Sequence, residues 1–131
     1  MDGSATATGL RELTAGIGRL EATVIERLKL TARASADRIA AEAANILRSK
    51  THGTGRTAAS IRVLDESGDK QFVVNCPGNP DQPANLPLWL ERGTRHMSAR
   101  PFMRPAADAE SDRYRRNMLA AAEAATSESL S

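Results

Sequence analysis

Apolar residues recur at steps of three and four through the first third of the chain, and this repeat constrains the fold more than any other feature. The repeat comprises Leu10, Leu13, Ile17, Leu20, Val24, Leu28, Ala32, Ala36, Ile39, Ala43 and Ile46. Such spacing places all its members on one face of an α-helix. It predicts a helix over residues 9–50, several times the average length, although Gly16 and Gly18 weaken its early part. A small domain cannot cover so long a stripe. We therefore expect the first half to bind a partner or to support a neighbouring subunit.

Strand and turn signals follow the predicted helix. Gly53 and Gly55 suit its C-terminal cap, because glycine readily adopts the left-handed backbone found there. The runs on either side of "ESGDK" predict an antiparallel hairpin at about 60–66 and 70–76. Four prolines in residues 77–87 then predict an irregular loop.

The last part of the chain shows a second helical region. The run "LPLWLERG" predicts a short helix with Pro87 in its first turn and Gly93 at its end. Pro101 and Pro105 disfavour helix at the residue before each, so the segment between Gly93 and Pro105 is expected to be an extended strap. A final helix is predicted over 105–126, with Pro105 in its first turn.

These elements together predict an α+β fold. It has a long N-terminal helix, a small antiparallel β-sheet built on a hairpin, a short helix, an extended proline-containing strap and a C-terminal helix. The length of 131 residues indicates one domain. The predicted boundaries are a disordered tail at 1–8, a domain at 9–126 (long helix 9–50, sheet and loops 51–104, C-terminal helix 105–126) and a frayed tail at 127–131.

The composition predicts a thin core and excludes some classes of protein. Apolar residues make up 40% of the chain, but many are Ala and aromatic residues are only 3%. Association with other copies is a common way to supplement such a core. The single cysteine excludes an intramolecular disulfide. Because neither a signal peptide nor a membrane-spanning run is evident, we expect a soluble protein made in a cytoplasm and no membrane partner.

Residues 86–106, "LPLWLERGTRHMSARPFMRPA", resemble a site because they concentrate Trp, His, Arg and Pro. A catalytic role is the first possibility. Cys76 and His96 are one conceivable nucleophile–base pair and His52 is another base, but no local pattern orients them. Cys76 is better explained as a small apolar residue at the end of a strand. We predict a protein that is not an enzyme, with no catalytic residues, no cofactor site and no metal site, because no ligand spacing is present.

Nucleic-acid binding is the second possibility for this stretch. Basic side chains lie at Arg92, Arg95, His96, Arg100 and Arg104. Trp89 and Phe102 are interleaved with them and could stack on bases. Nearby acidic residues offset much of the charge, the net charge is only +2, and no known binding motif is present. At most, weak and non-specific DNA contact is expected.

A mechanical joint is the third possibility. Gly93 permits a positive φ after the short helix and hence a sharp turn. The two prolines then hold the strap extended, which lowers the entropy cost of docking it, and Phe102 and Met103 supply apolar anchors. Two interpretations stay open: Phe102 fills the core of its own domain, or the strap meets a neighbouring subunit.

The residues of this stretch also resemble a known family. "LWLERGTRHMSARPFMRPA" is similar to a pattern of an aromatic residue shortly before Glu-x-Gly-Thr, followed by Pro-Phe-hydrophobic-Arg-Pro-Ala. That pattern is typical of gene-product-ten-like neck or tail-completion proteins of long-tailed bacteriophages. The upstream "TGRTAASIRV" resembles a second feature of the family, Thr-Gly followed by Ser-Ile at the first strand. The resemblance spans about residues 10–125; it departs at Ser98, where Pro is common, and at the longer loop 77–87.

The resemblance implies a set of structural or subunit-interface residues. They are Thr54, Gly55, Ser60, Ile61, Trp89, Glu91, Gly93, Thr94, Arg95, Pro101, Phe102, Arg104, Pro105 and the following Ala106. Arg92 and Arg100 are implied as possible contacts to DNA in the lumen of a ring.

The resemblance further implies a structural virion protein rather than an enzyme. Such a protein forms a homo-oligomeric ring at the neck or the top of the tail, assembled in the host bacterial cytoplasm, and completes the tail or joins it to the head around the DNA channel. Six copies are favoured and twelve remain possible. Its partners would be neighbouring neck, head-completion, tail-terminator or tail-tube proteins. The alternative is a nucleic-acid-binding module that grips phosphate through its Arg-rich strap.

Overall fold

The structure, a computed structural model, describes residues 3–50, 55–66, 68 and 71–130, with the side chains of 9–50, 55–66, 68 and 71–128. Its elements are α1 (Gly3–Lys50), α2 (Arg56–Ala59), β1 (Arg62–Glu66), β2 (Gln71–Asn75), α3 (Leu86–Arg92) and α4 (Met103–Leu130). The predicted fold class is confirmed: two long helices, a short helix and a two-stranded antiparallel sheet occur in the expected order.

The long helix α1 begins earlier than predicted. It starts at Gly3, so the disordered tail predicted for residues 1–8 is wrong from residue 3 onward. Alanines in this segment favour helix, which offsets the weak propensity of its Gly and Thr. Within α1, the hydroxyls of Thr14, Thr23 and Thr31 each donate to the carbonyl four residues earlier, so their polar groups are satisfied inside the helix.

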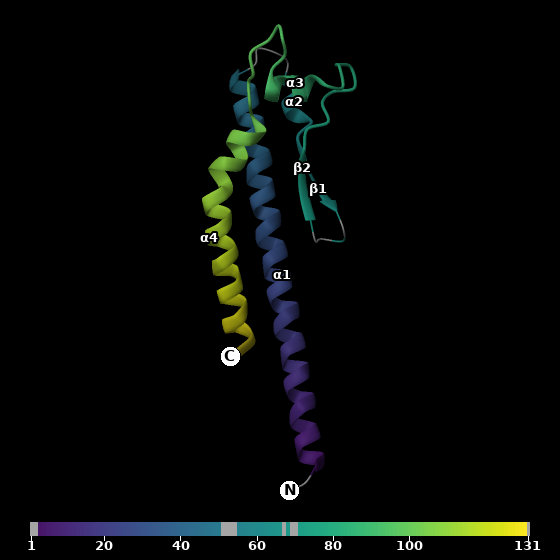
Figure 1. Cartoon of the computed structure of the whole chain (residues 1–131), viewed down its shortest axis with the longest axis vertical. Helices are drawn as coiled ribbons and strands as arrows, with labels where there is room; N and C mark the ends of the chain where they lie inside the picture. The colour runs from purple at the N-terminus through teal and green to yellow at the C-terminus, as the bar shows by residue number, and fades with distance from the viewer. Residues whose placement is uncertain (1–2, 51–54, 67, 69–70, 131) are drawn as a thin grey trace.

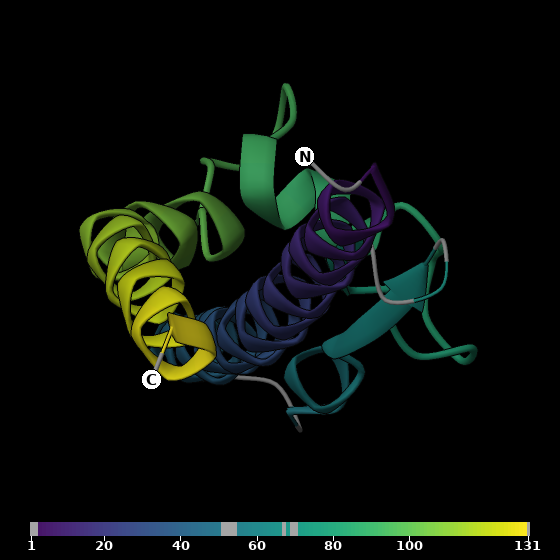
Figure 2. The same ribbon diagram turned by 90° about the horizontal axis from the view of Figure 1, so that it is seen from below.

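The helix α4 lies antiparallel beside α1, and the β1–β2 hairpin lies on another side of it (Figures 1 and 2). Figure 1 shows α1 extending well beyond the end of α4 and beyond the hairpin. Two contacts define the pairing of α1 with α4: Ser35 bonds to Glu110, and Arg27 forms an ion pair with Glu128. The N-terminal part of α1 therefore projects from the rest of the molecule. This agrees with the prediction that a small domain cannot cover the whole apolar stripe of so long a helix.

The hairpin is close to its predicted position. Its register runs from Arg62 opposite Asn75 to Glu66 opposite Gln71. The first strand starts later than residue 60 because the short helix α2, absent from the prediction, is capped at its C-terminus by Ser60. The hairpin packs on α1, where the Arg33 guanidinium lies 5.8 Å from the centre of the Phe72 ring.

The core is small and rich in alanine, as the composition predicted. Its main cluster gathers where the end of α1, α2, α3 and the start of α4 meet, and comprises Ala43, Ala44, Leu47, Ala58, Leu90, Phe102 and Ala106. Alanine lets helices approach closely but removes little apolar area from water per residue. Large apolar side chains elsewhere on the molecule stay exposed.

A buried polar network joins α1 to α4. The Glu110 side chain is almost fully buried; its Oε1 accepts hydrogen bonds from Ser35 Oγ at 3.0 Å and from Arg38 Nε at 2.8 Å. Arg38 also donates to Ser35 Oγ. The hydrogen bonds from Arg38 are the largest cause that lowers the pKa of Glu110, and the bond from Ser35 adds to it. Together they outweigh burial, which would raise the pKa. A buried polar group must keep its partners, so this network selects one alignment of the two helices.

Candidate functional site

The candidate site is the joint, which we define as Glu91 and Gly93 at the end of α3, the connection 94–102, the first turn of α4 and Lys50 at the end of α1. Its central contact is a helix cap, in which the side chain of Glu91 from α3 binds the backbone at the start of α4. Glu91 Oε2 accepts the backbone N–H of Phe102 at 2.8 Å and of Met103 at 3.0 Å, and Oε1 accepts that of Arg104 at 3.0 Å. Glu91 thereby satisfies the N–H groups that the start of a helix leaves without partners.

The electrostatics of this cap favour an ionised carboxylate. Burial by itself raises the pKa of Glu91, but the three backbone N–H donors and the positive charge of Lys50 outweigh it, so the pKa of Glu91 lies below its ordinary value. The positive end of the α4 dipole faces the same carboxylate. Glu91 therefore stays charged at neutral pH and holds the first turn of α4 against α3.

Gly93 makes the turn out of α3, as predicted. Its φ of 79° and ψ of 174° fall in a region that only glycine occupies readily. A Cβ at this position would lie 2.8 Å from the Ala99 nitrogen and 3.0 Å from the Met97 carbonyl oxygen. Both neighbours are backbone atoms that cannot move aside alone. Gly93 is thus required by its dihedral angles and also by close packing of the connection against it.

The connection after Gly93 is only partly extended, which corrects the prediction of one strap. Thr94 and Met97 exchange backbone hydrogen bonds, and Thr94 Oγ1 accepts the His96 N–H, so residues 94–97 form a tight turn. The following helix begins at Met103 instead of 105 and runs to Leu130 instead of 126. The early start is possible because Glu91 supplies the missing acceptors, and Pro105 still falls in the first turn, where its lack of an N–H is harmless.

The end of α1 is attached to the same connection. Lys50 Nζ donates to the Pro101 carbonyl at 2.9 Å, and the Arg100 guanidinium lies 3.5 Å from the Lys50 carbonyl. The Arg100 backbone N–H donates to the Leu90 carbonyl at 2.6 Å. These bonds link α1, α3 and α4 through one short segment, so a displacement of the connection would be transmitted to all three helices.

The two aromatic residues of the stretch have different environments. Phe102 is 1% exposed and belongs to the core. Of the two interpretations left open, the structure therefore supports the one in which Phe102 fills the core of its own domain. A stacking role of Phe102 on bases is therefore wrong. Trp89, in α3, is 38% exposed. Thr94, Arg95 and Arg104 are also exposed, whereas Pro101 and Pro105 are half-buried.

The residues of the upstream motif form a second, smaller cluster. Gly55 has a φ of 78°, but it precedes α2 instead of capping α1; Gly53 and Thr54 lie outside the described residues. Ser60 Oγ donates to the Thr57 carbonyl at 2.6 Å and accepts the Gly78 N–H at 3.0 Å. Ile61 packs against the core.

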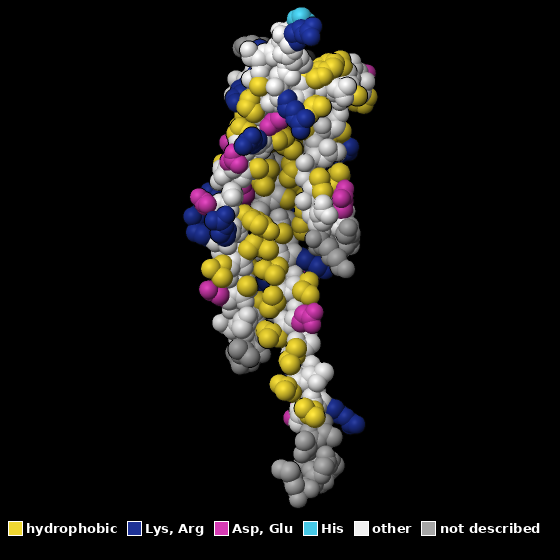
Figure 3. Space-filling view, viewed as in Figure 1, with side chains coloured by type: hydrophobic (Ala, Val, Ile, Leu, Met, Phe, Trp, Pro, Cys, Tyr) yellow, Lys and Arg dark blue, Asp and Glu magenta, His cyan; other side chains and the backbone are white. Residues whose placement is uncertain are grey.

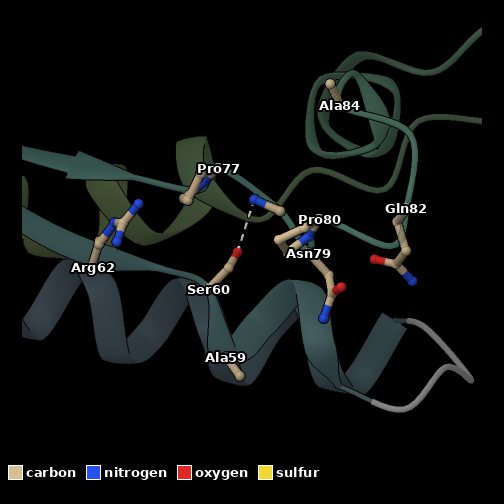
Figure 4. A pocket seen from close by; sticks show the side chains of 9 residues that line it. Ala59, Ser60, Arg62, Pro77, Asn79, Pro80, Gln82 and Ala84 are labelled. Atoms are coloured by element: carbon tan, nitrogen blue, oxygen red, sulfur yellow. Dashed lines mark hydrogen bonds between the residues drawn. The ribbon is translucent and has the colours of Figure 1, made fainter.

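Figure 4 shows the Ser60–Gly78 bond beside a pocket of about 510 Å³ between α2 and the proline-rich loop. Thr57 Oγ1 donates to Gln82 at 2.8 Å from the same helix. The residues of the upstream motif thus attach the proline-rich loop to α2. They lie apart from the joint.

The other candidates for chemistry are separate from the joint. Burial raises the pKa of the Cys76 thiol more than its contacts with Ser60 and the Gly78 backbone lower it, so the thiol stays protonated at neutral pH. His96 is exposed on the 94–97 turn, and His52 lies outside the described residues. In the described part of the chain, no three His, Cys, Asp or Glu side chains gather closely enough to hold a metal ion. No helix there carries an apolar stretch that could cross a bilayer.

Sequence reasoning missed the capping role of Glu91, the contribution of Lys50 to the joint and, outside the joint, the buried position of Glu110. The motif selects Glu91 but does not reveal its capping role, because capping signals are sought within a few residues of the helix start. The absence of a Ser, Thr, Asp or Asn immediately before Met103 was the available sign that a distant residue caps α4. Lys50 and Glu110 were missed altogether, since single charged residues in helical runs are usually solvated.

Comparison of the chain with family models, curated proteins and solved structures yields no match.

Proposed function

We propose that this chain is a structural bacteriophage protein that forms a ring at the neck or the top of the tail, where it completes the tail or joins it to the head. The observation that carries the proposal is the resemblance of residues 88–106 to the neck and tail-completion pattern described above. The roles of the matched residues support it: Glu91 caps α4, Gly93 makes a turn that other residues cannot make, and Phe102 fills the core. Each of these roles is mechanical.

The unburied surface of the molecule also supports an assembly role. Large apolar side chains remain exposed along the projecting part of α1, including Leu10, Leu13 and Ile17. Apolar surface gathered in this way usually marks a site of protein–protein contact. A cyclic ring requires two different complementary surfaces on each subunit, and the projecting helix offers one.

Electron microscopy of particles tests this function. Particles that carry the wild-type gene should show density for the chain as a ring between head and tail, with six subunits favoured over twelve. Particles that lack the gene should accumulate as filled heads and separate tails, and a plasmid copy should restore joining. Density spread through the capsid shell or confined to the tail tip would refute the placement.

Phosphate binding is a second candidate because several exposed Arg side chains at the joint have no carboxylate partner among the described residues. Arg92, Arg95, Arg100 and Arg104 are exposed, and among the described residues none of them forms an ion pair with a carboxylate. Such side chains could contact the DNA that passes through a ring.

A binding assay separates this second candidate from the first. Fluorescence anisotropy with duplexes of random sequence should show weak binding that falls steeply with salt. Changing all four Arg residues to Gln should abolish it, whereas Arg11→Gln and Arg19→Gln on the distant end of α1 should not. No binding at about 50 mM salt would exclude the phosphate-binding role.

A further inference from the structure

The strand β1 has one free edge. In the described part of the chain the sheet consists of β1 and β2 alone, and the main contacts of β1 are with β2 and α1. The hairpin and α4 lie on different sides of α1 (Figure 1), and the groove between them is lined by residues of β2 and by none of β1. A free strand edge presents backbone N–H and C=O groups that can pair with another strand.

Three side chains of β1 share the face of the hairpin that points away from α1. Both neighbours of Val73 in β2 line the groove over α1, so Val73 itself points outward, because side chains alternate along a strand. Leu64 lies opposite Val73 and shares this outer face. Arg62 and Glu66 lie two positions before and after Leu64, and therefore flank it on the same face.

The two charged residues of this outer face have neutral neighbours across the hairpin. Arg62 lies opposite Asn75, and Glu66 lies opposite Gln71. Both charged residues are exposed, and among the described residues neither forms an ion pair. Figure 3 shows charged side chains of both signs at the outer margin of the hairpin, apart from the hydrophobic band between the hairpin and α4.

We propose that the free edge of β1 pairs with β1 of a second copy, antiparallel about a twofold axis at Leu64, so that two hairpins form one four-stranded sheet. The sequence of β1, RVLDE, has complementary charges at its two ends. Arg62 of each copy therefore lies opposite Glu66 of the other, and the two Leu64 side chains meet at the axis. This pairing concerns the free protein and does not rest on the ring proposed above.

The charges favour this register over the alternatives. A parallel pairing in register would set Arg62 against Arg62 and Glu66 against Glu66, and like charges directly opposite each other destabilise a sheet. An antiparallel pairing shifted by one residue would set Leu64 against Asp65. The symmetric antiparallel register forms two ion pairs and one apolar contact instead.

The pairing also covers apolar surface. Leu64 and Val73 are only half-buried in the single chain. In the four-stranded sheet the two copies of each residue lie in one row across the outer face, with an ion pair on either side of it. The twofold axis is perpendicular to the sheet, so both α1 helices stay on the opposite face. Four strands backed by helices are more stable than a single hairpin.

Sedimentation equilibrium of the full chain tests the proposal. The wild type should sediment as a dimer with twice the chain mass of 14.0 kDa. Arg62→Glu and Glu66→Arg each replace two pairs of opposite charge with two pairs of like charge, so each should raise the dimer dissociation constant by about tenfold. Arg116→Glu and Glu123→Arg change the same charges at exposed positions of α4. These matched controls should leave the dimer unchanged.

Combined charge changes test the register. The double variant Arg62→Glu and Glu66→Arg is again complementary to itself and should regain the affinity of the wild type. An equimolar mixture of the two single variants should form a mixed dimer that is tighter than the dimer of either variant alone, because each supplies the charge that the other needs. All the changed side chains are exposed, so helical circular dichroism should stay the same.

Hydrogen exchange locates the interface without any substitution. The amides of β1 should exchange more slowly in the dimer than after dilution to monomer, whereas those of α4 should not change. A wild type that stays monomeric at high concentration would overturn the proposal, as would a dimer that both single variants leave intact. A double variant as weak as the single ones would exclude the antiparallel register.

Discussion

Gly93 shows how one residue determines the shape of the joint. Its positive φ and the backbone atoms around it each exclude a side chain. We expect Gly93→Val to destabilise the fold strongly and Gly93→Ala to do so by about 1–3 kcal/mol, because strain and a steric clash act together. Urea denaturation measures the difference.

Gly18 provides the matched control for that experiment. It lies in α1, and a β-carbon added at this position would meet no other atom within 4 Å. Gly18→Ala should therefore stabilise the helix by about 1 kcal/mol. If Gly93→Ala were as stable as the wild type, the described turn would be wrong.

Phe102 is the largest fully buried side chain. Phe102→Ala should lower the free energy of unfolding by about 3–5 kcal/mol, since it removes apolar contacts and leaves a cavity. Chemical denaturation monitored at Trp89, which lies in α3, provides the measurement. A loss well below 1 kcal/mol would mean that the ring is exposed in the free chain. Trp89→Ala, at a half-exposed position, should cost far less.

Glu91 stabilises α4 through hydrogen bonds that an amide cannot reproduce. Glu91→Gln keeps the size of the side chain but replaces one accepting oxygen with an NH₂ group, which faces another N–H donor. We expect a loss of about 0.5–2 kcal/mol, the usual range for a lost helix cap. Glu123→Gln, at an exposed position of α4, should have little effect. Equal stability of both variants would contradict the capping role.

At the scale of elements, the register of α1 against α4 depends on the buried network around Glu110. Glu110→Ala leaves Ser35 and Arg38 without their shared acceptor and should cost about 1.5–3 kcal/mol. Hydrogen exchange should show faster exchange in α4 and in the facing part of α1 than in the β1–β2 hairpin. Uniform acceleration across all elements would instead indicate global loss of stability without a specific role in helix pairing.

The sequence predicted elements well where a periodic pattern determines them. The stripe from Leu10 to Ile46 determines α1, and Pro87 with Gly93 brackets α3 nearly to the residue. The prediction from sequence failed where tertiary contacts determine the local structure. The turn 94–97 and the early start of α4 depend on Glu91 and on packing around Gly93. No local propensity encodes such contacts, because their partners lie in other elements.

Prediction of the candidate site succeeded and failed for the same reason. The motif selected Glu91, Gly93 and Phe102, and all three lie in the joint. It did not reveal Lys50, which is far away in the sequence and reaches the Pro101 carbonyl only in the folded chain. The cluster around Ser60 was selected with the joint but lies apart from it, because the motif follows the chain and not its three-dimensional arrangement.

At the scale of the whole molecule, acid should weaken the fold through two carboxylates. The pKa values of Glu91 and Glu110 are both lowered on folding from an ordinary value of about 4.5. Their contribution is therefore complete above that value and is lost as the pH falls through the lowered pKa values. Thermal unfolding between neutral pH and strong acid should show stability decreasing below about pH 4.5. The Glu91→Gln and Glu110→Gln double variant should show a smaller decrease; an equal slope would contradict this origin.

The antiparallel pairing of α1 with α4 has a consequence for synthesis on the ribosome. The partners in this pairing are far apart in the chain: Ser35 and Glu110 are separated by 75 positions, and Arg27 and Glu128 by 101. The nascent chain therefore exposes the face of α1 that α4 covers until α4 has been synthesised. Nascent chains stalled before Met103 should bind chaperones that recognise apolar segments, and release of the complete chain should end that binding.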